Sequence, residues 1–268
     1  VAGNAAAQVT SASFTVDTTV PTISAIATSA FSWGSHLNAT EDNSNGTVSV
    51  TTSGVEDGQT VTITLNSATY TAIVSSDAAT VTITASGLQA LSEGSETLTA
   101  DVSDVAGNAA AQVTSASFTV DTVLPTLVSA ITGDNNSDGT VDRLVLTFSE
   151  QVDLTSVDNN NFTLTESAGG SPTITGSYSS SDQTTVTLIL TGVTANNTSL
   201  TISPNYDDDT GTIIDNVGNE MSFSETVSGT DGAAPVFSSI TPTENSSIKV
   251  ADVGYRLSET IANGSITF

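Results

Sequence analysis

Cysteine is absent from this 268-residue chain, so disulfide bonds cannot stabilise its domains. Basic residues are almost absent as well: 3 Lys and Arg stand against 29 Asp and Glu, which gives a formal charge of -26. Such a charge repels nucleic acids and anionic lipids and attracts cations. We therefore expect no nucleic-acid partner, and we expect a metal ion to provide the stabilisation that disulfides cannot.

Long apolar runs and the residues of common catalytic sites are also missing. No run of about 18 apolar residues occurs, so direct membrane insertion is not expected. His36 is the single histidine. Without cysteine there is no Cys–His arrangement, and the sequence shows no recognisable Ser–His–Asp spacing around this histidine. We expect that the protein is not an enzyme.

The chain is instead marked by repetition. Residues 1–18, VAGNAAAQVTSASFTVDT, recur letter for letter at 105–122. The spacing of Asp104-Val-Ala-Gly-Asn108 returns as Asp215-Asn-Val-Gly-Asn219. Repetition of this kind is typical of tandem modules. We predict the last strand of a preceding repeat at 1–17, complete modules at 18–121 and 122–231, and the opening part of a further module at 232–268.

Alternation of apolar residues with Thr or Ser predicts strands throughout both modules. In the first module they lie near Ile23–Ile26 and at 47–52, 60–65, 68–74, 79–85, 96–102 and 116–120. In the second they lie at 143–148, 161–165, 173–178, 184–190, 199–202 and 221–227. About seven short strands per module predict an all-β immunoglobulin-like sandwich, with one helical turn at 87–91. Tandem modules of this kind predict an extended rod.

Three segments carry a family resemblance: Val55–Asn66, the run Leu98–Asn108, and the junction Phe118–Thr126. They resemble the bacterial Ig-like repeats of very large surface adhesins, the biofilm-associated and RTX-type extender modules of Gram-negative bacteria. Residues 122–231 resemble the Ig-like domains of bacterial surface-layer and cell-wall proteins. The resemblance implies secretion, calcium at module junctions, and a rod that holds an adhesive tip away from the cell.

The junctions predict calcium on chemical grounds too. In a sandwich, the loop Asp101–Asn108 and the loop after the second strand reach the pole where the linker enters. Carboxylates that converge without a basic partner repel one another, and a hard cation with oxygen ligands removes that cost. The predicted ligands are Asp17, Glu56, Asp57, Asp101, Asp104 and Asn108 at the first junction, Asp121, Asp215 and Asn219 at the second, and Asp231 at the third. The alternative is a solvated acidic surface with turn residues.

A second candidate calcium site is the loop from Asp134 to Asp142. It matches the first six positions of an EF-hand loop, but Val145 stands at the twelfth position in place of a bidentate Glu. The predicted ligands are Asp134, Asn136, Asp138 and Asp142, in a loop between two strands. The alternative is a polar turn of the same sequence. The acidic cluster Asp207–Asp209 is expected to stay solvated.

These features favour a non-enzymatic, calcium-rigidified extracellular spacer in a large repetitive bacterial adhesin, secreted to the cell surface and active in cell adhesion and biofilms. Its partners would be the neighbouring modules of the same chain. The alternative is a structural subunit of a filament, sheath or surface layer, in which copies of the chain assemble through module contacts or strand exchange.

Overall fold

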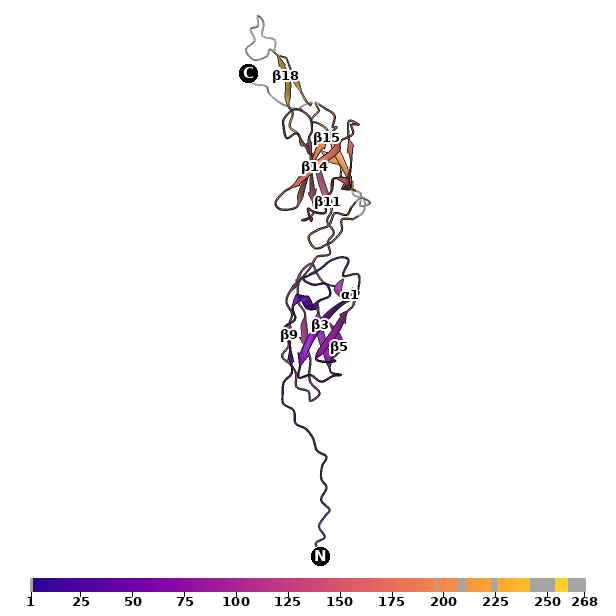
Figure 1. Ribbon diagram of the computed structural model, residues 1–268, viewed down its shortest axis with the longest axis vertical. Helices are drawn as coiled ribbons and strands as arrows, with labels where there is room; N and C mark the ends of the chain where they lie inside the picture. The colour runs from indigo at the N-terminus through magenta and orange to yellow at the C-terminus, as the bar shows by residue number, and fades with distance from the viewer. Residues whose placement is uncertain (1, 196, 207–210, 223–225, 242–253, 260–268) are drawn as a thin grey trace. The chain divides into compact units, whose positions relative to one another are not determined.

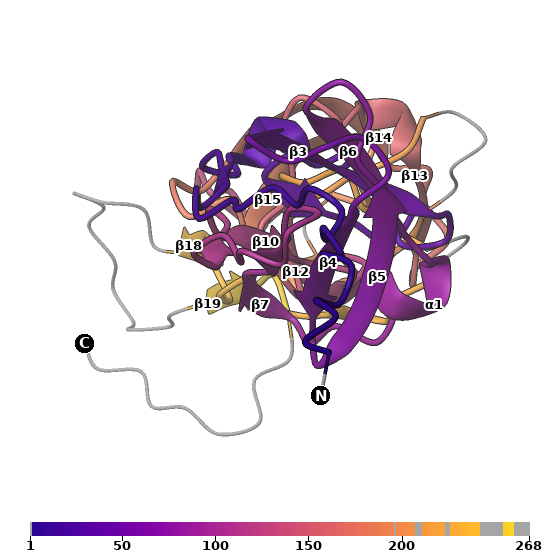
Figure 2. The ribbon, with the colours of Figure 1, turned by 90° about the horizontal axis from the view of Figure 1, so that it is seen from below.

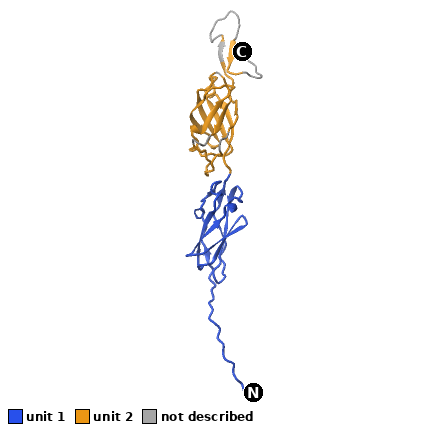
Figure 3. Ribbon diagram, turned by 90° about the vertical axis from the view of Figure 1, so that its right-hand side faces the viewer, with its two compact units in different colours: residues 1–122 blue, residues 123–268 orange. Residues whose placement is uncertain are grey.

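The computed structural model describes residues 2–195, 197–206, 211–222, 226–241 and 254–259. The chain divides into two compact units, 1–122 and 123–268 (Figure 3). Each unit has a hydrophobic core of its own. Ile63 and Phe118 are central to the first core, and Leu188 and Tyr206 to the second. The predicted opening part of a third module, 232–268, lies partly outside the described residues, as does the cluster Asp207–Asp209.

The first unit is built from ten short strands around its core (Figure 1). They are β1 (Thr22–Ile23), β2 (His36–Leu37), β3 (Gly46–Ser53), β4 (Thr60–Leu65), β5 (Ala68–Ile73), β6 (Ala78–Ile83), β7 (Gly94–Glu96), β8 (Thr99–Asp101), β9 (Val113–Thr114) and β10 (Phe118–Val120). A 3-10 turn η1 (Thr28–Ala30) and one helical turn α1 (Ala85–Leu88) complete it. The helical turn starts two residues before the predicted one, where the Thr84 side chain accepts a hydrogen bond from the Gly87 amide.

These strands form sheets in the orders β1-β3-β6, β5-β4-β8-β9 and β2-β10-β7. In Figure 2, β4 lies beside β5 and β3 lies beside β6. Alternate residues of β4 and β6 are buried, because successive side chains of a strand point to opposite faces. The Thr residues between them face outward. The all-β immunoglobulin-like prediction is confirmed.

The second unit repeats this plan with longer strands. They are β11 (Leu127–Gly133), β12 (Arg143–Phe148), β13 (Phe162–Glu166), β14 (Thr173–Ser179), β15 (Thr185–Thr191), β16 (Ile202–Tyr206), β17 (Gly229–Thr230), β18 (Phe237–Thr241) and β19 (Gly254–Leu257), with a 3-10 turn η2 (Asn159–Asn161). One sheet has the order β14-β15-β12-β11-β17, in which β11 and β17 are parallel. Two antiparallel pairs, β13-β16 and β18-β19, accompany it.

One predicted strand of the second unit is misplaced, and another lies partly outside the described residues. The strand expected at 199–202 is β16, which begins at Ile202 and contains Pro204, a residue that interrupts the alternating pattern. The strand expected at 221–227 lies partly outside the described residues, and its Thr226 forms a single bridge with Asn205. Among the described residues, no helix is long and apolar enough to cross a membrane.

Candidate metal centres

The loop between β8 and β9 is organised around one buried carboxylate. The Asp104 side chain is 4% exposed. Its two oxygens accept hydrogen bonds from the backbone N–H and the side-chain Nδ2 of Asn108, both at 2.8 Å. The Gly107 amide donates to the Asp104 carbonyl at 3.2 Å. Gly107 has φ +91, a backbone conformation that favours glycine. The shape of the turn therefore explains why a glycine stands at this position.

Hydrogen bonding lowers the pKa of the Asp104 carboxyl. The Asn108 side chain is the largest influence and lowers the pKa of this carboxyl below its ordinary value of 3.8. Burial opposes this effect, while the amides of Asn108, Gly107 and Ala106 add to it. Donors to a carboxylate favour its charged form. Asp104 therefore carries a fixed negative charge at neutral pH.

The second unit contains the same loop. The Asn219 backbone N–H and Nδ2 donate to the two oxygens of Asp215 at 2.9 and 2.7 Å. The Val217 amide donates to Asp215 at 2.8 Å, and Gly218 has φ +92. Asp215 and Asn219 are 3% and 1% exposed. The hydrogen bonds between the two residues are thus the same in both modules, although the surrounding sequences differ.

The first loop is tied to the incoming chain. Asn108 Nδ2 also donates to the Asp17 carbonyl oxygen at 3.2 Å. The Val105 amide donates to Glu56 Oε2 at 3.0 Å, which brings the loop between β3 and β4 to the same pole. Asp17, Glu56, Asp104 and Asn108 therefore converge. The ligand atoms that these residues can offer are carboxylate oxygens, a backbone carbonyl oxygen and the Asn108 Oδ1, and oxygen ligands suit a hard cation such as calcium.

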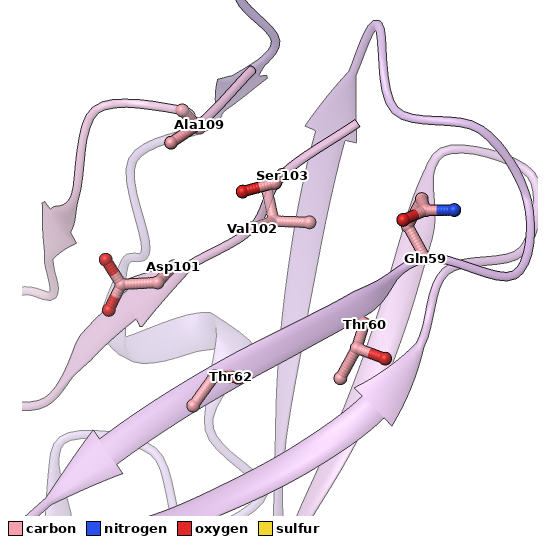
Figure 4. Close-up of a pocket in the computed structure, with 8 residues that line it drawn as sticks. Gln59, Thr60, Thr62, Asp101, Val102, Ser103 and Ala109 are labelled. Carbon is pink, nitrogen blue, oxygen red and sulfur yellow. The ribbon is translucent and has the colours of Figure 1, made fainter. Parts of the chain in front are cut away.

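Two residues of the predicted first set point elsewhere. Asp57 accepts a hydrogen bond from the Ser76 amide at 2.7 Å, in the turn between β5 and β6. Both oxygens of Asp101 accept from Gln112 Nε2, at 3.1 and 2.9 Å. Asp101 and Thr62 line a hollow of about 280 Å³, and Figure 4 shows the residues around it. The structure thus gives these two carboxylates local partners.

A carboxylate pair accompanies the second loop. A carboxylate oxygen of Glu150 lies within 4.8 Å of a carboxylate oxygen of Asp215. Glu150 follows β12 directly and is partly buried. Like charges this close raise each other's energy, and a divalent cation would relieve the repulsion. Asp121, which we predicted for the same junction, belongs to the first unit, where its amide donates to the Leu37 carbonyl at 3.0 Å.

A second carboxylate pair lies at the predicted third junction. Burial is the main cause that raises the pKa of Glu259, and the charge of Asp231 together with a hydrogen bond between the two carboxyls adds to the rise. The Asp231 carboxylate also accepts from the Ala233 amide at 3.1 Å. Asp231 thus has an acidic neighbour, as Asp215 has in Glu150.

The loop from Asp134 to Asp142 joins β11 to β12, which are antiparallel. Its carboxylates accept hydrogen bonds from the loop itself: Asp134 from the Gly139 amide at 2.8 Å, Asp138 from the Thr140 amide at 2.9 Å, and Asp142 from the Asn135 amide at 2.8 Å. Asn136 accepts from the Asp138 amide at 3.0 Å. These hydrogen bonds hold the loop in a compact polar turn.

Glu150 and Glu259 were not among the predicted ligands, although the sequence carries a signal for them. The run Leu144–Glu150 is echoed by Val253–Glu259, and both end in Ser-Glu. In both places the Ser-Glu pair follows a strand, β12 or β19.

A family model for the bacterial Ig-like domain matches residues 121–230. No curated protein matches the chain. A solved bacterial Ig-like domain from the M. primoryensis ice-binding adhesin is 31% identical over 38% of this chain and 96% of its own, with a TM-score of 0.27. The residues matched by the family model include Glu150 and the Asp215–Asn219 loop of the second unit.

Two longer solved structures are also similar. One comes from a 1.5-MDa bacterial ice-binding adhesin, with 18% identity over 84% of this chain and 71% of that one, and a TM-score of 0.42. The other is described as a Ca2+-stabilized adhesin that helps an Antarctic bacterium reach out and bind ice, with 22% identity over 80% of this chain and a TM-score of 0.33. The present chain spans 49% of that second structure.

Proposed function

The chain belongs to the bacterial Ig-like family, and from this premise we propose that it is a non-enzymatic spacer segment of a large bacterial surface adhesin. In this function the modules supply length and stiffness outside the cell, in adhesion and biofilm formation. The absence of cysteine and the formal charge of -26 agree with an extracellular chain stabilised by cations.

We propose further that calcium stiffens the linkers. The observation that carries this proposal is the repeated Asp–Asn loop, which holds a buried carboxylate beside a junction residue or a second carboxylate. The proposed ligands are Asp17, Glu56, Asp104 and Asn108 at the first junction, Asp121, Glu150, Asp215 and Asn219 at the second, and Asp231 and Glu259 at the third. Without calcium, these carboxylates repel one another, and the linkers gain freedom.

Calcium affinity need not be high for this function. Extracellular modules bind calcium with dissociation constants of about 10⁻⁴–10⁻³ M. Free calcium at about 100 times the dissociation constant would stabilise a module by about 2.7 kcal/mol. That is a large share of the roughly 5–15 kcal/mol that stabilises an ordinary domain. Stiffening would therefore follow the calcium level outside the cell.

Small-angle X-ray scattering of the chain in calcium chloride and in EDTA tests the proposal. We expect calcium to increase the radius of gyration and to narrow the distribution of interatomic distances. Glu150→Gln should weaken this response, because it removes one proposed ligand. Asp77→Asn removes a charge at an exposed turn and should leave the response intact. Identical scattering curves in calcium and EDTA for the unaltered chain would refute calcium stiffening.

The alternative is a structural subunit of a filament, sheath or surface layer, in which copies of the chain assemble through module contacts or strand exchange. Sedimentation at two protein concentrations separates this alternative from a monomeric spacer.

A further inference from the structure

The outer face of the second unit's five-stranded sheet carries exposed apolar side chains. Leu144, Leu188 and their alternating neighbours face the core, so the residues between them face outward. On this outer face, Ile131 of β11, Ile189 of β15 and Tyr178 of β14 are 40%, 43% and 52% exposed. In the first unit, the outward positions of β4 and β6 hold only Thr and Ala. Large apolar side chains that gather on one exposed face commonly mark a binding surface.

The strand register places Tyr178 and Ile189 on the same part of this face. Tyr178 lies opposite Thr187. Ile189, two residues further along β15, lies between Gly176 and Arg143. Gly176 leaves one flank of Ile189 uncovered, since a Cβ atom there would meet only Ile189 Cδ1, at 3.6 Å. A hollow of about 120 Å³ opens here, and its lining consists of Asn135, Asp142, Arg143, Tyr178 and Ile189.

Arg143 brings unused hydrogen-bond donors to the hollow. Its Nη1 donates to Asn135 Oδ1 at 3.0 Å, and its Nε is buried without a partner. The side chain lies across Gly133, where any Cβ atom would collide with it. Within the part of the chain that the structure describes, no carboxylate forms an ion pair with Arg143. A guanidinium has five N–H donors, so most of those of Arg143 stay available to a ligand.

The same hollow also offers hydrogen-bond acceptors. Asp142 Oδ1 accepts from the Asn135 amide at 2.8 Å. The second oxygen of Asp142 and the Tyr178 hydroxyl form no hydrogen bond with other described residues. A hydroxyl both donates and accepts, and a carboxylate accepts. Donors and acceptors thus stand beside the apolar surface of Tyr178 and Ile189, and the charges of Arg143 and Asp142 balance.

A sugar ring matches this combination, because its faces present C–H groups and its edge presents hydroxyls that both donate and accept. We propose that the hollow binds one ring of a neutral saccharide. The C–H face of the ring packs on Tyr178 and Ile189, and its hydroxyls bond to Arg143, Asp142 and Asn135. An anionic ligand is disfavoured by the Asp142 carboxylate and by the formal charge of -26. An apolar surface with a few polar groups that fix orientation is the usual make-up of a small-molecule site.

The size of the hollow limits what it can hold. At about 120 Å³ it is smaller than the pockets of about 300–1,000 Å³ that enclose a drug-sized ligand. One ring of a longer saccharide therefore enters, and a single site binds weakly. Many copies of the site on one surface would strengthen the attachment by multivalency. This binding goes beyond the proposed spacer function and uses none of the proposed calcium ligands, so it can be tested in EDTA.

NMR titration of the whole chain in EDTA tests the site. Arg143 and Arg256 are the two arginines, so the spectrum holds two arginine Nε–H signals, and Arg143→Lys identifies that of Arg143. The probes are hexasaccharides of glucose, mannose, galactose and N-acetylglucosamine, with hexagalacturonate as the acidic counterpart. We expect a saturable shift of the Arg143 signal with at least one neutral probe and no shift with the acidic one. No shift with any neutral probe would overturn the proposal.

Substitutions of the ring separate stacking from a general effect on the fold. Tyr178→Ala should weaken binding of the responding probe about tenfold, whereas Tyr178→Phe keeps the ring and should retain most of the affinity. Ile73→Ala is the matched control, because it removes a side chain that is 58% exposed on β5 of the first unit, and it should leave binding unchanged. Unchanged affinity in Tyr178→Ala would contradict the proposed site.

Sedimentation velocity of the unaltered chain without sugar examines a competing occupant, a second copy of the chain. We expect a mass that does not depend on protein concentration. A mass that rises with concentration, is returned to that of one chain by Tyr178→Ala, and is accompanied by no response to any saccharide would show that this face pairs two copies. That result would overturn the saccharide site.

Discussion

At the scale of single residues, the Asp104–Asn108 pair predicts a pH effect. The pKa of Asp104 is lowered in the folded state, chiefly by the Asn108 side chain. A carboxyl with a depressed pKa stabilises the fold above its unfolded pKa, and this contribution is lost as the pH falls through the folded value. We therefore expect the free energy of unfolding of the first module to fall as the pH drops below 3.8, the ordinary value.

The variant Asp104→Asn isolates this effect, because an amide does not titrate. Urea unfolding from pH 6 down to pH 2 should show a shallower loss of stability for the variant than for the unaltered chain, even if the variant is less stable at neutral pH. Parallel pH profiles for the two proteins would contradict the assignment of the lowered pKa to Asp104.

At the scale of elements, β17 depends on a glycine. A Cβ atom at Gly229 would lie 2.2 Å from the Ile202 carbonyl oxygen and 2.7 Å from the Ile202 nitrogen. These are backbone atoms of β16, so β17 would have to move away from β16. We expect Gly229→Ala to cost about 1–3 kcal/mol of unfolding free energy in the second module. Gly176→Ala is the control, since its Cβ would meet only Ile189 Cδ1 at 3.6 Å.

Long alternating strands were predictable, and short ones formed by distant pairing were not. The segment Arg143–Phe148 alternates buried and partly buried residues and is β12 to the residue. By contrast, β2 is the two residues His36–Leu37, which are defined by their pairing with β10, far away in sequence. Two residues cannot display a period. The extent of β16 was also not predictable, because it contains Pro204 and proline is uncommon inside a strand.

The candidate site residues show the same difference between local contacts and contacts that are distant in sequence. Asp104 and Asn108 are four residues apart, so their turn follows from local sequence, and the same spacing locates Asp215 and Asn219. Glu150 and Asp215 are distant in sequence and meet only because β12 and the later loop end at one pole. Asp57 lies in the expected loop and Asp101 is the last residue of β8. The hydrogen bonds of their carboxylates with Ser76 and Gln112 are not encoded by the spacing.

At the scale of the whole molecule, the two cores predict two independent unfolding transitions. The first core contains Trp33, the single tryptophan, and the second contains Leu188, which is fully buried. Leu188→Ala should cost about 2–5 kcal/mol in the second module alone. The unfolding midpoint followed by Trp33 fluorescence should then stay unchanged while an earlier transition appears in circular dichroism. A shift of the fluorescence midpoint would contradict independent cores.

The parallel pair β11–β17 gives the second module a defined response to mechanical load. Within residues 122–231, β11 is the first described strand and β17 the last, and Ala130 and Ile131 lie opposite Gly229 and Thr230. Tension on the two ends of the module pulls these parallel strands past each other along their length. The interstrand bonds must then break together instead of one after another. A tether built from such modules would resist a sudden pull, such as fluid drag on an attached cell, until the pair gives way.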